Sequence, residues 1–230
     1  MNNFRGGLTT YFAWNPVKET SGEQQKFDVR HGVRSKKKEE AVNTVSEAIN
    51  KRRSIRSYQS KPVSRDIVEA IINDGNEALS AMNSKPWRFV VVENEEVKKK
   101  LLRASLPHAK KILETVKESD PARYEAITKR LNELPDPVYY SAPVIVFVIG
   151  TGRYASHSCP LACENMMLAA YSMGIGSCWV GFGSMVTADD EVKRILELKE
   201  EEMIFGPILL GYAEIYHERP IKREPLVKWV

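Results

Sequence analysis

The chain has few cysteines and no long apolar run, and both shortages limit what kind of protein it can be. Its 230 residues contain three cysteines, all in the second half: Cys159, Cys163 and Cys178. A small, odd number of cysteines argues against a disulfide scaffold and suits a reducing compartment, so we expect a cytoplasmic protein. No stretch approaches the roughly 20 apolar residues that span a bilayer. The amino terminus also lacks the apolar segment of a secretory signal, so we expect no membrane partner.

An excess of charge of either sign is also missing from most of the chain. Lys and Arg number 34 against 30 Asp and Glu, a formal net charge of +4. Residues 1–38 hold eight basic and three acidic residues, or +5, which leaves 26 basic and 27 acidic residues, or −1, in the remainder. A basic extension with aromatics nearby can favour a nucleic-acid backbone, but no recognition motif accompanies it. We therefore expect no nucleic-acid partner.

The first 40 residues lack the apolar periodicity of the rest of the chain. They contain more aromatic side chains than a solvated tail would need: Phe4, Tyr11, Phe12, Trp14 and Phe27. We expect residues 1–40 to be an N-terminal extension, part of which packs onto the domain or, as an arm, around a second subunit. Residues 41–230 are expected to form one domain.

Apolar periodicity predicts the elements of residues 41–230. Helices are expected over 39–53, 64–78, 158–173 and 189–198, and through the charged segment 95–134 with breaks at Pro107 and Pro121; strands are expected over 87–92, 144–149 and 204–213. The helix 158–173 is apolar on nearly all sides, which predicts that it is buried centrally or at a dimer interface. The elements together predict an α+β domain with an antiparallel or mixed sheet between helices.

Two segments suit an anionic or planar ligand. Arg52-Arg53-Ser54-Ile55-Arg56 places guanidinium groups beside a hydroxyl, which is a set that can bind phosphate through charge-assisted hydrogen bonds. The other interpretation is a basic helix end that complements the helix dipole. The segment from Ser80 to Phe89 passes from a polar loop into a strand, and its Asn83 offers both donor and acceptor groups to a planar heterocycle.

Two later segments add glycine and positive charge. Four glycines lie between Gly174 and Gly183, where they permit close backbone approach to a ligand. This segment follows a helix rather than a strand, so it is not a dinucleotide-binding fingerprint. A second basic cluster, Arg219 to Pro225, follows the last predicted strand.

In this order, Arg-Arg-Ser-x-Arg, Ser-x-x-Asn-x-x-Pro-Trp-x-Phe, the glycine-rich turn and the late Lys-Arg pair resemble the nitroreductase family, flavoenzymes that hold FMN at a homodimer interface. The resemblance runs from about Val42 to the C-terminus. It implies a nitroreductase-like α+β fold, with a central, mostly antiparallel sheet flanked by helices, and an intertwined homodimer.

The resemblance also implies cofactor-binding roles for residues near the start of the domain. Arg52 and Ser54 match family residues that contact the FMN phosphate and ribityl chain, and Arg53 lies beside them. Arg56 matches a cationic residue at the pyrimidine edge of the flavin, where positive charge stabilises the reduced form.

Further cofactor-binding roles fall on three later segments. Ser80 and Asn83, with the backbone around Met82, match the loop that reaches the flavin from the partner subunit. The backbone at Val180 and Gly181 matches the segment that faces flavin N5. Lys222 and Arg223 match the basic pair that closes on the phosphate. Lys85 departs from the family, which commonly has Gln there, and adds a charge close to the partner's cofactor.

The resemblance implies an FMN-dependent oxidoreductase that passes hydride from NADH or NADPH through flavin N5 to an electrophilic acceptor, such as a nitroaromatic or a quinone, in a ping-pong cycle. Alternatives are another flavin reaction on the same fold (reductive dehalogenation, substrate oxidation or flavin fragmentation) or a non-enzymatic flavin- or nucleic-acid-binding protein. The segment 98–138, where relatives place substrate-gating helices, carries no family motif, so the acceptor stays open.

No catalytic side chain or metal site is predicted. The hydride chemistry belongs to the flavin, so the protein's task is to position the reactants and tune the cofactor. Cys159, Cys163 and His157 lie close together in sequence, but zinc and iron–sulfur sites normally need four ligands.

Overall fold

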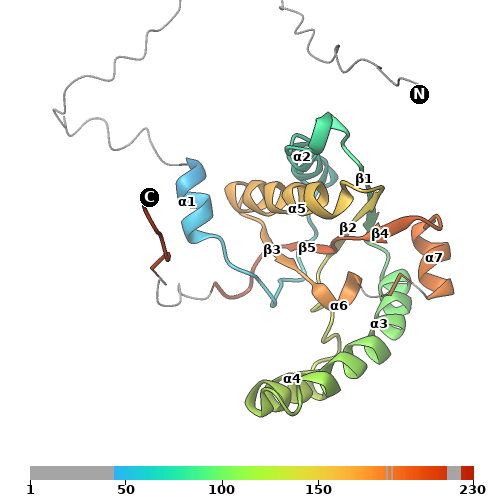
Figure 1. The fold of residues 1–230 in the computed structure, drawn as a ribbon. Coiled ribbons are helices and arrows are strands. Elements are labelled where there is room, and N and C mark those ends of the chain that lie inside the picture. The colour runs from blue at the N-terminus through green and yellow to red at the C-terminus, as the bar shows by residue number, and fades with distance from the viewer. Residues whose placement is uncertain (1–43, 185, 188, 217–223) are drawn as a thin grey trace, which may run out of the picture. The chain divides into compact units, whose positions relative to one another are not determined.

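The computed structural model describes residues 44–184, 186–187, 189–216 and 224–230, and Figure 1 shows their arrangement. The expected arm over residues 1–40, and Lys222 and Arg223, lie outside these described residues. In chain order the elements are α1 (Thr44–Lys51), α2 (Arg65–Asn76), the 3₁₀ turn η1 (Ala81–Asn83), β1 (Trp87–Val92), α3 (Glu95–Val116), α4 (Pro121–Glu133), β2 (Val144–Thr151), α5 (Ala155–Ser172), β3 (Gly176–Trp179), α6 (Gly181–Ser184), α7 (Asp190–Leu196), β4 (Glu202–Ile204) and β5 (Ile208–Gly211).

Strand β2 is the centre of the sheet. Strand β1 pairs antiparallel along one side of it, and β5 and β4 pair antiparallel with successive parts of its other side. Strand β3 pairs antiparallel with β5 and gives the strand order β1-β2-β5-β3. The predicted α+β fold with a mostly antiparallel sheet flanked by helices is therefore confirmed.

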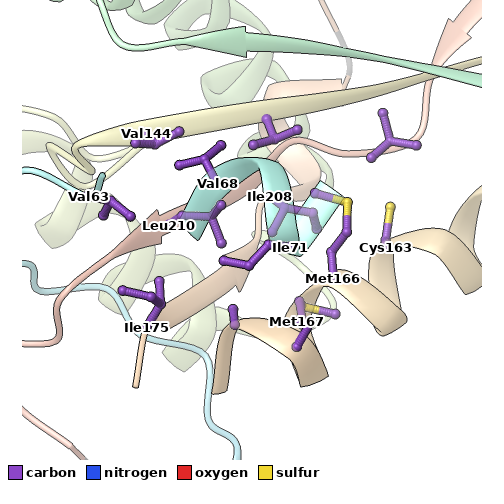
Figure 2. Close-up of a cluster of buried hydrophobic side chains, with 14 of the residues drawn as sticks. Val63, Val68, Ile71, Val144, Cys163, Met166, Met167, Ile175, Ile208 and Leu210 are labelled. Carbon is purple, nitrogen blue, oxygen red and sulfur yellow. The ribbon is translucent and has the colours of Figure 1, made fainter. Parts of the chain in front are cut away.

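Alternate residues of β2 enter two different cores because side chains point to opposite faces along a strand. Val144, Val146 and Val148 pack with residues of α2 and α5. Figure 2 shows this first core, in which Val68 of α2 lies beside Val144, and Ile71 lies toward Met166 of α5. Ile145, Phe147 and Ile149 join a second core with residues of α3 and α7. Apolar residues at six successive positions of β2, from Val144 to Ile149, thus place helices on both faces of the sheet.

Helix α5 is buried on most sides, as its apolar composition predicts. Gly75 of α2 lets it pack closely, since a Cβ at this position would lie 2.4 Å from Cγ of Met166. The helix ends at Ser172, Gly174 two residues later has a left-handed φ of +73°, and Ile175 N donates to Ala170 O at 2.8 Å. This is a glycine C-cap, and it directs the chain into β3 beside β5.

The predicted break at Pro107 is wrong, because α3 continues through this residue. Leu101, Ser105, Ala109 and Leu113 recur every four residues on one buried face, and this packing outweighs the one helix hydrogen bond that proline cannot make. The predicted break at Pro121 is confirmed, since this residue begins α4 after the Asp120 cap.

Three strand predictions also change. The single strand predicted over 204–213 is two strands, because Pro207 has no N–H for the ladder and separates β4, which ends at Ile204, from β5, which begins at Ile208. Strand β3 was missed: its four residues are too short to show a period, and pairing with β5 imposes the extended form. Strand β1 has the predicted bounds, but it is mostly half-buried because the described sheet ends there.

Candidate functional site

The segment that follows α1, residues 52–59, lies along the edge of β3 that is not paired with β5. Ile55 N donates to Ser177 O at 2.9 Å, and Gln59 N donates to Tyr212 O at 2.9 Å. Ile55 is 1% exposed and packs against Gly176, where an added Cβ would lie 2.9 Å from Cγ1 of Ile55. A buried isoleucine thus anchors the motif, and its polar neighbours lie beside β3.

Arg52 and Arg53 differ in what their guanidinium groups already bind. Nη1 of Arg53 donates to Asn50 O at 3.0 Å and also to Arg52 O, so it binds carbonyls at the end of α1. Nε of Arg52 and Nε of Arg53 are both buried without a hydrogen-bond partner among the described residues, and Nε of Arg52 has an ion-pair contact of 3.9 Å with Oε1 of Glu164. A buried donor without an acceptor is costly, so Arg52 is suited to donate to an anionic ligand.

Several positive charges surround the end of β3 at Cys178. Burial raises the pKa of the Cys178 thiol, while the charge of Arg56, a hydrogen bond with Ser54, and the charges of Arg52 and Arg130 act to lower it. These groups come from the segment after α1 and from α4. The structure therefore brings Arg52, Ser54 and Arg56 together at one end of the sheet.

A pocket of about 420 Å³ opens beside these residues. Its lining comes from the segment after α1, from α4, and from the chain around β3 and α6; the residues are Arg56, Arg123, Ala126, Ile127, Arg130, Tyr140, Cys178, Trp179, Val180, Gly181 and Phe182. This volume is within the range of small-molecule sites. The pocket joins Arg56 to the predicted Val180–Gly181 backbone, and Figure 1 shows α4 in the same part of the domain as α6.

The α4 wall of the pocket is the part that sequence reasoning missed. Arg123, Ala126, Ile127 and Arg130 lie at positions i, i+3, i+4 and i+7, which is the spacing of one helix face. That spacing is a signal in the sequence. The spacing alone does not assign this helix face to the pocket, because segment 98–138 carries no motif of the family.

The backbone at Val180 and Gly181 offers one free N–H rather than two. Val180 N donates to Pro207 O at 3.0 Å. Gly181 begins α6, where the first N–H groups have no partner within the helix. An added Cβ at Gly181 would meet nothing within 4 Å, so the space above this residue is open.

The loop between α2 and β1 lies away from the pocket that Arg56 lines (Figure 1). Met82 and Asn83 have left-handed backbones with φ of +55° and +53°, and Met82 is 86% exposed. Oγ of Ser80 accepts from Lys85 N at 3.0 Å, and Ala81 N donates to Oγ of Ser158 at 3.3 Å. In Figure 1 the turn between α2 and β1 lies well away from α6. Within one chain, Ser80, Met82 and Asn83 are therefore not brought to the pocket that Arg56 lines.

Helix α1 exposes an apolar face. Val45 is 67% exposed and Ile49 is 56% exposed, although both belong to the apolar face predicted from the sequence. Val45 and Ala48 also line a hollow of about 440 Å³ with residues of α2 and α5. This exposed apolar surface is of the kind that marks a protein interface.

The two cysteines of α5 are buried in the first core. Burial raises the pKa of the Cys159 thiol to about 12 and also raises the pKa of Cys163, so both thiols stay protonated at neutral pH. Within the described ranges, no three His, Cys, Asp or Glu side chains gather as a metal site would require. None of the described helices combines the length and apolar character needed to cross a membrane.

The model of the nitroreductase family matches residues 49–212, and the chain belongs to this family. A "Putative NADH dehydrogenase/NAD(P)H nitroreductase" of Methanothermobacter thermautotrophicus is 29% identical over 174 residues, which are 73% of this chain and 76% of that protein. An iodotyrosine deiodinase of Thermotoga neapolitana is 30% identical over 192 residues, covering 78% of this chain and 94% of that one.

A solved structure supports the same assignment. The nitroreductase of Bacteroides fragilis with bound FMN has a TM-score of 0.67 and 29% identity, and the match covers 82% of this chain and 100% of that one. The nitroreductase of Desulfitobacterium hafniense with bound FMN has a TM-score of 0.69 at 23% identity, covering 82% of this chain and 99% of that one, and shows the likeness of fold.

Proposed function

We propose that this protein is an FMN-dependent oxidoreductase that passes hydride from NADH or NADPH to an electrophilic acceptor such as a nitroaromatic or a quinone. The observation that carries the proposal is the pocket that joins Arg56 to the open backbone of Gly181, in a chain of the nitroreductase family. FMN, when bound, supplies the redox chemistry by taking up hydride at N5 and giving it to the acceptor. The protein's residues would bind FMN, orient the reactants and tune the reduction of the flavin.

The described residues fit FMN at its phosphate end. Arg52, with its buried and unpartnered Nε, and the Ser54 hydroxyl would bind the phosphate and ribityl chain. Arg53 has Nη1 committed to carbonyls and would contribute mainly charge. Lys222 and Arg223, outside the described residues, would close on the same phosphate.

The flavin-ring end fits as well. Arg56 would place positive charge at the pyrimidine edge, which favours the electron-rich reduced form. Since Val180 N already donates to Pro207 O, the N–H of Gly181 would be the one that faces flavin N5, and Val180 would hold that backbone in place. The reaction with a nitro compound consumes one NAD(P)H and one proton and yields NAD(P)⁺, the nitroso compound and water.

Each site would be built by two copies of the chain. Ser80, Met82 and Asn83 lie away from the pocket of their own chain, so they would reach the flavin held by a partner. The apolar face of α1 supports a homodimer because Val45 and Ile49 are left exposed in one copy. We also propose that residues 1–40 form an arm around the partner, beside the single domain 41–230, in a cytoplasmic protein.

Reductive dehalogenation is the second candidate function. The iodotyrosine deiodinase of Thermotoga neapolitana is 30% identical, and the match covers 94% of its length. In that reaction the acceptor would be an iodinated phenol, whose carbon–iodine bond is replaced by a carbon–hydrogen bond while iodide leaves.

Steady-state kinetics of the full chain with FMN separate these functions. We expect NADH or NADPH consumption that rises several-fold above the rate with oxygen alone when a nitroaromatic or a quinone is added. Iodide release from 3-iodotyrosine, with no stimulation by nitroaromatics or quinones, would instead select the dehalogenase. No stimulation by any of these acceptors would reject both functions.

A further inference from the structure

The pocket holds more positive charge than the cofactor accounts for. Three arginines line it, and only Arg56 has a cofactor role under the proposed function. Arg123 and Arg130 come from α4 and lie seven residues apart on one helix face, a rise of about 10 Å along the axis. Ala126 and Ile127 lie between them on the same wall.

These arginines lack carboxylate partners. Among the described residues, no Asp or Glu forms an ion pair with Arg56, Arg123 or Arg130, and the pocket lining contains no acidic side chain. The neighbouring Lys129 does have a partner, since its Nζ lies 3.9 Å from Oε1 of Glu133. The unpaired cations of α4 are therefore those that line the pocket.

Arg130 lies beside the Tyr140 ring, and one of its N–H donors has no acceptor among the described residues. Its Cζ lies 5.7 Å from the centroid of the Tyr140 ring, and Cζ of Arg56 lies 6.0 Å from the same centroid. Nε of Arg130 is buried and has no hydrogen-bond partner among the described residues. Two like charges beside one ring, with donors left over, favour an anion between or beyond them.

We propose that the acceptor taken by this site is a planar electrophile that carries a carboxylate or a similar single anionic group, bound by Arg130 and Arg123. The apolar body of the acceptor would lie against Ala126 and Ile127 of the α4 wall and against Phe182 of α6, which line the same pocket. This inference rests on the proposed function, because it names the substrate class of the same pocket.

Two nitro compounds of nearly equal shape test the charge preference: 4-nitrobenzoate, an anion, and 4-nitrobenzamide, which is neutral. We expect the holoenzyme to have the higher kcat/KM for 4-nitrobenzoate. Arg130→Gln and Arg123→Gln should each lower the ratio of the two kcat/KM values about tenfold or more, since each removes a charge-assisted hydrogen bond. Lys129→Gln, on the same helix but outside the pocket lining, should leave this ratio unchanged.

A binding measurement reads the same site without turnover. Benzoate titrated into the oxidised, FMN-loaded protein should perturb the flavin absorption, with a Kd raised about tenfold in Arg130→Gln and unchanged in Lys129→Gln. Circular dichroism and FMN content confirm that each variant is folded and loaded.

The outcomes separate this inference from the function on which it rests. If both nitro compounds are reduced with the same kcat/KM ratio in the parent protein and the arginine variants, the anion site is wrong and the oxidoreductase stands. If neither is reduced but benzoate binds through Arg130, the anion site stands and the reaction is wrong. A raised KM for NADH or NADPH with an unchanged acceptor ratio assigns the arginines to the dinucleotide phosphates and overturns the inference.

Discussion

Single N–H groups decide which ligand atoms this site can bind. At the phosphate end, Arg52 and Arg53 each keep a buried Nε without an acceptor among the described residues, but Nη1 of Arg53 is already bound to the carbonyls of Asn50 and Arg52. At the flavin end, Val180 N is bound to Pro207 O, and Gly181 begins a helix with its N–H unused. Adjacent residues of the same motif therefore have different tasks.

Arg52 supplies the first prediction. Arg52→Ala should weaken FMN binding about 10- to 100-fold, because a charge-assisted hydrogen bond to a phosphate contributes about 1.5–3 kcal/mol. FMN titration followed by flavin fluorescence measures the Kd. Arg65→Ala is the matched control, since Arg65 is an exposed arginine of α2 whose Nε lies 2.7 Å from Oε1 of Glu69. Equal affinities for FMN in the two variants would remove Arg52 from the phosphate site.

Among the elements, the junction of β1, β4 and α7 depends on one ion pair. Nη2 of Arg88 in β1 lies 2.7 Å from Oε2 of Glu202 in β4. The same nitrogen donates to Leu196 O at 3.0 Å and to Glu197 O at 2.9 Å, at the end of α7. Glu202 is 7% exposed, so this charge is held among packed elements rather than at the surface.

The contribution of this ion pair to the stability of the fold should decrease at acidic pH. The hydrogen bond from Arg88 is the main cause that lowers the pKa of Glu202 from 4.5 to about 2. Because the pKa is depressed in the folded state, the contribution is fully present above pH 4.5 and is lost as the pH falls toward 2. Thermal unfolding across this range should show a smaller loss of Tm on acidification in Glu202→Gln than in the parent chain.

Glu200→Gln serves as the control for that experiment, because Glu200 is exposed and forms no ion pair among the described residues. It should lose Tm on acidification as the parent chain does. Parallel Tm curves for Glu202→Gln and the parent chain would show that the ion pair does not contribute to stability.

The predictability of each element depends on how much of its conformation is local. Helix α5 and strand β2 were predicted because each is long and apolar enough to show its period, or its burial, within its own residues. Strand β3 depends on a partner distant in sequence, so its own composition did not reveal it. The continuation of α3 through Pro107 likewise depends on tertiary burial. The division between β4 and β5 has a local signal in Pro207, which the predicted strand 204–213 ran through.

The same distinction holds for the site. The resemblance to the family identified the segment 52–56 and the Val180–Gly181 backbone, and the structure brings these together. The α4 wall was missed because its residues belong to no family motif and reach the pocket through tertiary packing. The distance of Ser80 and Asn83 from the pocket of their own chain could not be read from sequence order.

For the whole molecule, the central structural proposal is that one FMN site takes residues from two chains. Arg52→Ala and Asn83→Ala should each weaken FMN binding when present in both chains of a homodimer. In a mixed dimer, one site would combine Arg52 of one chain with Asn83 of the other and be intact, while the second site would lack both residues. Co-expressed and separately tagged chains should therefore recover tight binding of one FMN per mixed dimer. No recovery would place both residues in a site formed within one chain.

The most direct test of the account is whether the purified full chain binds FMN and transfers hydride through it. The flavin absorption of the FMN-loaded protein is followed without oxygen as NADH or NADPH is added, and then a nitroaromatic. The account predicts that one of the two nicotinamides bleaches the absorption of the oxidised flavin and that the nitroaromatic restores it. Absence of FMN binding in a titration, or a bound flavin that neither NADH nor NADPH bleaches, would contradict the account.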